Sequence, residues 1–400
     1  MQKSVELNRA GEAAGTLLDQ NSIKLANRKV ILDLLLQERI LTKQEISERT
    51  GFSFPTVSNS IGSLLQQGLV REAGTADSTG GRKPKLIEFN PNSRFAFGVT
   101  IQGQGIRVVR SNIDMQIVDD VEVPIRRGAS AAALVETICT SVSDMICRSG
   151  TSIQSFLGIG VAVSGYVNRK TIMIEAASNL GLKNVSLASL ADRTGLAVYI
   201  ENEANAAALA EQRLGIAQGM SNLIYISITE GVGSGMIIDG RLYMGAHNRA
   251  GELGHHTVVP GGRSCSCGKR GCWERYVAED VLLNEYRSVT GNGGVGLKEF
   301  FADLSEQRPQ AAELWERYIS YLVTGLHNIV AIYDPHYVVI GGNIAEYPQH
   351  LLPALMKGVF GASSYSQRED TYILVSELNK DAFILGAAFL PMGTLHARLG

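Results

Sequence analysis

Three of the five cysteines in this chain fall within eight positions, in the run Cys-Ser-Cys-Gly-Lys-Arg-Gly-Cys that begins at Cys265. A histidine, His255, lies ten residues upstream of the first cysteine. Three thiolates and one imidazole make a closed tetrahedral ligand set that suits a structural zinc ion. The predicted zinc ligands are His255, Cys265, Cys267 and Cys272. The alternative is a group of buried cysteines that cluster without a metal.

The same region resembles a signature of the ROK family. The motif Gly-Glu-Leu-Gly-His ends at His255, and Cys-x-Cys-Gly-x-x-Gly-Cys-x-Glu ends at Glu274. The glycine-rich run 230–235, followed by Asp239-Gly240, is similar to the other signature of that family. The resemblance covers roughly residues 93 to 400. It implies a two-lobed, actin-like (ribonuclease-H-like) ATPase fold with a sugar held between the lobes, but sugar kinases and sugar-responsive repressors share these motifs.

Length and composition predict several domains in a reducing compartment. A chain of 400 residues is longer than one ordinary core, and 45% hydrophobic residues are ample for burial. No apolar run reaches the roughly 18 residues of a membrane helix, and the N-terminus lacks the apolar segment of a secretory signal. Five cysteines without a paired framework fit a reducing environment. We therefore expect a cytoplasmic protein that does not insert into membranes.

Residues 1–90 are predicted to form a winged helix-turn-helix domain. Helical spacing of apolar residues predicts a first amphipathic helix, whose apolar face carries Ile23, Ala26, Val30, Ile31 and Leu34. Thr42 and Glu45 form a capping box at the start of a second helix, and Ser53 can cap a third helix that runs to about residue 67. Two β segments near 69–72 and 85–89 flank a loop that contains glycine and basic residues, as in a wing.

The outward face of the third helix is predicted to contact operator DNA. The helix carries no charge, and its small hydroxyls and amide can read base edges or hold phosphates. The predicted DNA-contacting residues are Ser53, Thr56, Ser58, Asn59 and Ser60 in the helix, and Arg82 and Lys83 at the wing tip. One uncharged helix reads few base pairs, so we expect a homodimer or a dimer of dimers on a pseudo-palindromic site. The alternative is a small dimerisation module with a solvated loop.

The remaining residues are predicted to form two α/β lobes. The first lobe comprises residues 91–203 together with 380–400, and the second comprises residues 204–379 and carries the zinc site. Strands are expected near 95–100, 106–110 and 117–123, followed by a helix at 131–148 and a strand at 157–163. Strands near 222–228 and 235–238 begin the pattern again, with later helices and a strand at 337–340. This repetition predicts a duplicated unit with a cleft between its halves.

The family resemblance implies sugar contacts only at positions that match. The run Glu-Asn-Glu-Ala-Asn, 201–205, resembles the family's Glu-Asn-Asp-Ala-Asn, in which the asparagine binds a sugar hydroxyl and the aspartate is the catalytic base. Glu203 replaces that base, and its extra methylene displaces the acceptor by about an ångström, a misplacement that can lower a rate ~100-fold. The residues expected at the sugar are Asn179, Asn202, Glu203, Glu252, His255 and Glu274. His255 would bind zinc through one nitrogen and sugar through the other. Glu252 could instead cap a helix, and Glu274 could be a surface charge.

The phosphate-binding half departs from the kinase pattern. Sugar kinases of the family open the first lobe with Asp-x-Gly-Gly-Thr, whereas here Thr100 replaces the aspartate, Gln102 a glycine and Gln104 the threonine. Bulky side chains block the close backbone approach that phosphate needs, and the carboxylate associated with the metal is missing. We therefore expect no catalytic residues, with Glu203 at a degenerate base position.

These observations favour a sugar-responsive, DNA-binding transcriptional repressor of carbohydrate-utilisation genes. The combined motifs at 201–205 and 265–274 most resemble the xylose-repressor branch of the family, so a sugar such as xylose is expected to release the protein from its operator. One alternative is a zinc-containing, glucokinase-like sugar kinase with an added DNA-binding domain. Another is a regulator governed by a protein partner.

Overall fold

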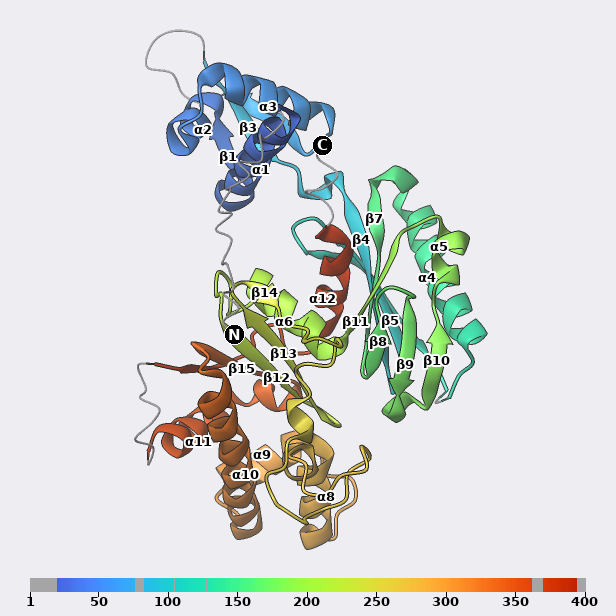
Figure 1. Ribbon diagram of the computed structural model, residues 1–400, viewed down its shortest axis with the longest axis vertical. Helices are drawn as coiled ribbons and strands as arrows, with labels where there is room; N and C mark the ends of the chain where they lie inside the picture. The colour runs from blue at the N-terminus through green and yellow to red at the C-terminus, as the bar shows by residue number, and fades with distance from the viewer. Residues whose placement is uncertain (1–19, 76–82, 104, 127, 362–369, 394–400) are drawn as a thin grey trace, which may run out of the picture. The chain divides into compact units, whose positions relative to one another are not determined.

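The computed structural model describes residues 20–75, 83–103, 105–126, 128–361 and 370–393 (Figure 1). The chain divides into two compact units, with the boundary between Ser93 and Arg94. Each unit has a hydrophobic core of its own. Among the described residues, no helix has both the length and the apolar character needed to cross a bilayer.

The N-terminal unit is a winged helix-turn-helix, as predicted. Its helices are α1 (Gln20–Glu38), α2 (Lys43–Thr50) and α3 (Phe54–Gln66), and its strands β1 (Ile40–Thr42), β2 (Val70–Thr75) and β3 (Lys85–Phe89) form a sheet of order β1-β3-β2. The capping box is present: the Thr42 hydroxyl accepts the backbone N–H of Glu45 at 3.2 Å, and the Glu45 carboxylate accepts that of Thr42 at 2.7 Å. The helices meet in one core, where Ile46, Val57 and Ile61 have no exposed surface.

Only the C-terminal half of α1 packs into this core. Ile31 and Leu35 are fully buried, whereas Ile23 and Val30 keep 46% and 45% of their surface exposed. The expectation that Ile23, Ala26 and Val30 belong to a buried face is therefore wrong, because all three are exposed. Val30 directly precedes Ile31 and therefore lies off the helix face that carries Ile31 and Leu35. Ile23 lies in the first turns of α1, N-terminal to Ile31, where none of the side chains that the structure describes is buried.

Two five-stranded sheets form the framework of the second unit and repeat one strand order. In the first, β4 (Phe95–Gln102), β5 (Gly105–Asn112) and β6 (Ile117–Pro124) are antiparallel neighbours, and β7 (Phe156–Val163) and β11 (Val198–Asn202) extend the sheet in parallel. In the second, β12 (Leu223–Ile228), β13 (Val232–Ile238) and β14 (Arg241–Leu242) match the antiparallel strands, and β15 (Tyr337–Gly341) and β16 (Tyr372–Val375) match the parallel ones. The orders β11-β7-β4-β5-β6 and β16-β15-β12-β13-β14 are equivalent, as the predicted duplication requires.

Helices α6 (Glu203–Arg213) and α12 (Asp381–Met392) lie between the two sheets (Figure 1). Helix α12 packs on β4 and β7, α6 packs on β12 and β13, and the two helices pack on each other. Small residues make this approach possible, since a Cβ on Gly386 would come within 2.0 Å of the Ala206 carbonyl oxygen. The packing places the first turn of α6, which begins at Glu203, between the two halves of the unit.

The remaining elements pack around these two sheets. A small antiparallel sheet of order β10-β9-β8, which the sequence did not predict, is inserted between β7 and β11. Its strands are β8 (Tyr166–Asn168), β9 (Met173–Ala177) and β10 (Leu182–Ser186). The other helices are α4 (Ala131–Ser149), α5 (Ser189–Thr194), α7 (Glu274–Val277), α8 (Glu279–Thr290), α9 (Leu297–Ser305), α10 (Pro309–Tyr333) and α11 (Pro348–Phe360). Short 3-10 helices span Pro91–Ser93, Ile153–Ser155, Ser178–Leu180, Leu253–His255 and Asn343–Glu346.

Candidate functional sites

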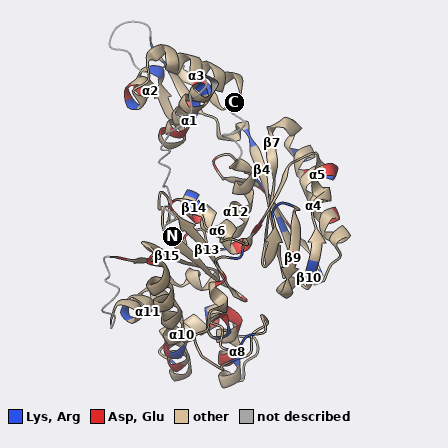
Figure 2. Cartoon of the chain, viewed as in Figure 1, with Lys and Arg blue, Asp and Glu red and all other residues tan. Residues whose placement is uncertain are grey.

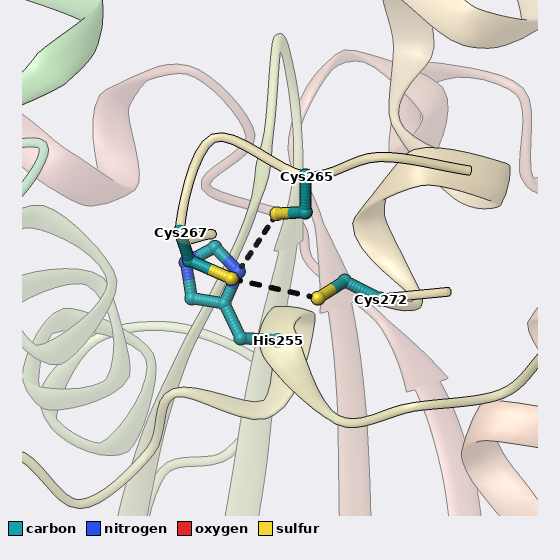
Figure 3. A group of neighbouring side chains, drawn as sticks. All are labelled: His255, Cys265, Cys267 and Cys272. Carbon is teal, nitrogen blue, oxygen red and sulfur yellow. Dashed lines mark hydrogen bonds between the residues drawn. The ribbon is translucent and has the colours of Figure 1, made fainter. Parts of the chain in front are cut away.

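The four predicted metal ligands converge on one point (Figure 3). Their ligand atoms all lie within 4.8 Å of one another. The Sγ atoms of Cys267 and Cys272 are 3.6 Å apart, and Cys265 Sγ is 3.6 Å from His255 Nδ1. Two sulfur atoms on one tetrahedral zinc ion, each bonded at about 2.3 Å, lie about 3.8 Å apart. The cluster therefore has the dimensions of a four-coordinate metal site.

Local backbone geometry explains why the cysteines meet. Gly271 has a φ of +81°, and a Cβ there would lie 1.7 Å from the Val259 carbonyl oxygen, so only glycine fits. The next two residues anchor the loop. Cys272 pairs with Thr257 in an isolated β-bridge, and Trp273 is fully buried, with its indole N–H donating to the Tyr321 carbonyl at 2.9 Å. The anchored loop holds Glu274, the first residue of α7, beside the metal ligands.

The His255 imidazole connects the metal cluster with a neighbouring cavity. Its Nδ1 faces the cluster and also lies 3.4 Å from Glu274 Oε1. Its Nε2 points the other way and lies 3.9 Å from Glu252 Oε2. Burial raises the pKa of the Glu252 carboxyl, His255 opposes that rise, and Glu274 adds to it. One ring can therefore serve the metal and the cavity at once.

A cavity of about 140 Å³ lies between the two halves of the second unit. All six residues predicted at the sugar line it: Asn179, Asn202, Glu203, Glu252, His255 and Glu274. Ser164, Gly165 and the glycine turn at 231–233 also line it. Tyr166, Ser178, Thr229 and Ser266 were missed. They belong to the unpredicted β8–β10 insertion, to a strand end and to the cysteine loop, and nothing local in the sequence marks them.

Asn202 has a structural role in addition to its place in the cavity. Its Oδ1 atom caps α6, accepting the backbone N–H groups of Ala204 at 2.9 Å and Asn205 at 3.2 Å. Its Nδ2 atom donates to the Gly165 carbonyl at 3.1 Å. Because an amide nitrogen has two hydrogens, one donor remains for a ligand. The cap fixes the direction in which that donor points.

Glu203 titrates near neutral pH. Burial raises the pKa of its carboxyl to about 7, a hydrogen bond from Ser164 opposes the rise, and the Glu230 carboxylate adds to it. A carboxyl with this pKa can accept a proton at physiological pH, which is the property that a general base needs. Whether Glu203 can act as a general base therefore depends on the position of its carboxylate rather than on its proton affinity.

The cavity continues toward the altered phosphate loop, where its lining is acidic. A space of about 250 Å³ is lined by Glu203, Glu230 and Glu279, with Lys380 as the single lysine or arginine among its described lining residues. Gln102 pairs with Gly105 at the end of the β4–β5 hairpin, so this segment closes as a tight turn. Gln104 lies outside the described residues. Three carboxylates around one lysine disfavour a nucleotide polyphosphate.

The third helix of the N-terminal unit presents an uncharged face (Figure 2). Ser53 caps the helix and bonds to Thr56 through their hydroxyl oxygens at 2.9 Å, and Asn59 is exposed. Ser58 is partly exposed and accepts a hydrogen bond from Lys43 Nζ at 3.1 Å. Ser60 is only 7% exposed and belongs to the core face of α3, which contradicts its prediction as a DNA-contacting residue. In the wing, Lys83 is exposed, and Arg82 lies outside the described residues.

Comparisons with known proteins cover both units. Residues 96–393 match the ROK family, and residues 25–71 match a winged helix-turn-helix DNA-binding family. The xylose repressor of Bacillus spizizenii is 30% identical over 373 residues, 92% of this chain and 96% of that protein. A crystal structure of a ROK family transcriptional regulator, a homologue of the E. coli MLC protein, matches with a TM-score of 0.79 at 21% identity, covering 94% of this chain and 98% of that one. A ROK family glucokinase from Streptomyces griseus, crystallised with glucose and AMPPNP, matches with a TM-score of 0.65 at 26% identity over 74% of this chain and 98% of its own.

Proposed function

Since the chain belongs to the ROK family and carries a winged helix-turn-helix, we propose that it is a transcriptional repressor released from its operator by a sugar. The observation that carries the proposal is the cavity lined by Asn202 and Glu203 on one side and by Glu252 and His255 on the other. A ligand that contacts both sides favours one separation of the two lobes. Such a ligand shifts DNA affinity only by the difference in its own affinity for the two states, typically about 1–3 kcal/mol.

The ligand that best fits this cavity is a neutral, unphosphorylated sugar. Three of its described lining residues are carboxylates, Glu203, Glu252 and Glu274, and none is a lysine or arginine. Carboxylates accept hydrogen bonds from sugar hydroxyls, but they repel a phosphate that has no basic partner. Relatives that are named xylose repressors, such as the one from Bacillus spizizenii, favour xylose as the first sugar to test.

The metal in this proposal is one zinc ion per chain with a structural role. Soft thiolate ligands favour zinc over the hard cations, and four protein ligands leave no open position for a substrate. When bound, the ion would cross-link His255 to the cysteine loop and so hold Glu252 and Glu274 at the cavity. We further expect a cytoplasmic homodimer or dimer of dimers, because a pseudo-palindromic operator requires two copies of α3.

The second candidate function is a sugar kinase with an added DNA-binding domain. The observation in its favour is Glu203, whose pKa of about 7 suits a base. Against it stand the longer side chain of Glu203 and the acidic lining at Glu230 and Glu279. These features oppose both the alignment of a sugar hydroxyl and the binding of a polyphosphate.

Operator titration separates the two candidates. A duplex site selected by the purified protein from a randomised library serves as the probe, and it is titrated with and without xylose, glucose and glucose 6-phosphate. The repressor proposal expects a neutral sugar to weaken DNA binding about 5- to 150-fold and the phosphorylated sugar to have no effect. Sugar-independent DNA binding together with ATP-dependent sugar phosphorylation would favour the kinase.

A further inference from the structure

The first residue of α3, Phe54, has an exposed aromatic side chain. Half of its surface, 50%, is exposed, the largest fraction for any large hydrophobic residue described in that unit. The other exposed large hydrophobics there, Ile23, Val30 and Ile40, lie outside α3. Burial of such a ring against a partner is favourable, and its exposure at the start of α3 leaves it available for that contact.

The exposed residues of α3 that follow Phe54 in the sequence are themselves uncharged. Pro55, Asn59 and Gly62 share the exposed face of α3, and a Cβ built on Gly62 would meet no atom within 4 Å. No residue of α3 is charged, so the helix itself cannot read guanine through arginine or lysine. Its recognition must depend on amide, hydroxyl and apolar contacts.

Local structure holds the Phe54 backbone in place. The Ser53 hydroxyl oxygen accepts the Thr56 backbone N–H and caps the helix, while Pro55 fixes φ within the first turn. In helix-turn-helix proteins the N-terminal residues of the second helix of the motif contact base edges in the major groove. The one apolar feature of a base pair in that groove is the 5-methyl group of thymine, which phenylalanine can contact.

We propose that Phe54 is a specificity-determining residue that recognises a thymine 5-methyl group in each half-site. The inference rests on the proposed DNA-binding function. Asn59 is exposed on the same helix. An asparagine amide can recognise adenine in the major groove, because it donates one hydrogen bond to N7 and accepts one from the N6 amino group. The chemistry of this face therefore favours A·T pairs where α3 enters the groove.

Deoxyuridine substitution tests this contact, because it removes only the methyl group. A duplex is first selected by the wild-type protein from a randomised library, and each thymine is then replaced singly by deoxyuridine. At one thymine per half-site we expect wild-type binding to weaken about fourfold, which corresponds to the burial of one methyl group. Phe54→Ala should bind the thymine duplex more weakly and lose all discrimination at that position, and Phe54→Leu should retain part of it.

Val30→Ala is the matched control, because Val30 is similarly exposed but lies on α1. It should keep the full response to deoxyuridine.

A wild-type protein that binds its selected duplex but responds to deoxyuridine at no thymine overturns the inference and leaves the proposed function standing. Equal discrimination by Phe54→Ala overturns it too. Failure of the wild-type protein to select any duplex rejects the DNA-binding function itself. If Phe54→Ala instead dissociates the oligomer and still discriminates thymine from deoxyuridine, the ring contacts a second copy of the chain rather than DNA, and the inference is overturned.

Discussion

The Nε2 atom of His255 lies 3.9 Å from the Oε2 atom of Glu252, on the side of the imidazole opposite the cysteine cluster. Any change that releases the imidazole from the cluster therefore also frees the ring that faces the ligand cavity. This arrangement makes the metal site and the cavity one mechanical unit, joined through a single side chain.

The first prediction concerns the metal. The purified protein should contain one zinc ion per chain, and Cys265→Ser should release it, because three ligands hold zinc less well than four. The free energy of unfolding should fall by an amount on the order of 4 kcal/mol, since loss of a bound metal is among the largest effects of single substitutions. Elemental analysis and thermal denaturation measure both quantities. Cys147→Ser, at an exposed cysteine outside the cluster, is the control and should change neither.

The second prediction follows from the burial of Glu203. Because burial raises its pKa from 4.5 to about 7, the folded state binds this proton more tightly than the unfolded state does. The resulting stabilisation is fully present below about pH 4.5 and is lost as the pH rises through about 7. Glu203→Gln should therefore stabilise the protein relative to wild type as the pH rises from 5 to 8, by at most about 2–3 kcal/mol.

Urea denaturation at the two pH values measures this difference. Glu313→Gln, on the exposed face of α10, is a matched substitution that should show no such pH dependence. An unchanged difference between Glu203→Gln and wild type across this range would mean that the carboxyl is better solvated than its surroundings imply.

The third prediction is that the protein lacks useful sugar kinase activity. Thr100 and Gln102 alter the phosphate loop, and Glu230 adds negative charge beside it. A coupled assay with ATP and common hexoses or xylose should stay at background, and Glu203→Asp should not restore turnover, because the loop remains altered. Turnover of about 1–1000 per second, the usual range for enzymes, would reverse the repressor assignment.

The fourth prediction identifies the sensor. Glu252→Ala removes a carboxylate from the cavity without touching the DNA-binding unit. It should bind operator DNA like wild type but need more sugar for release, because fewer groups hold the sugar between the lobes. The measurement is operator titration over a range of sugar concentrations, with Glu313→Ala as control. Normal release by Glu252→Ala would place the sugar sensor elsewhere.

Features that depend on neighbouring residues could be predicted from the sequence. The capping box of Thr42 and Glu45 needs only two side chains three positions apart, and the structure forms it. The cysteine cluster likewise depends on a short loop with glycine at its turns. The duplication could also be predicted, because most of its strands are short apolar runs between turns and recur in the same sequence along the chain.

Other features were decided by tertiary packing. Helix α12 was missed because it is buried between α6 and the first sheet, so it lacks the polar face that produces a helical period. Residue type alone predicts that Ser60 of α3 is exposed and that Phe54 is buried. Tertiary packing does the opposite, since it buries the serine and exposes the phenylalanine. The cavity depends on packing most of all. Asn179 and Glu274 are far apart in the chain, and both line it because α6, the β8–β10 insertion and the cysteine loop pack around one space.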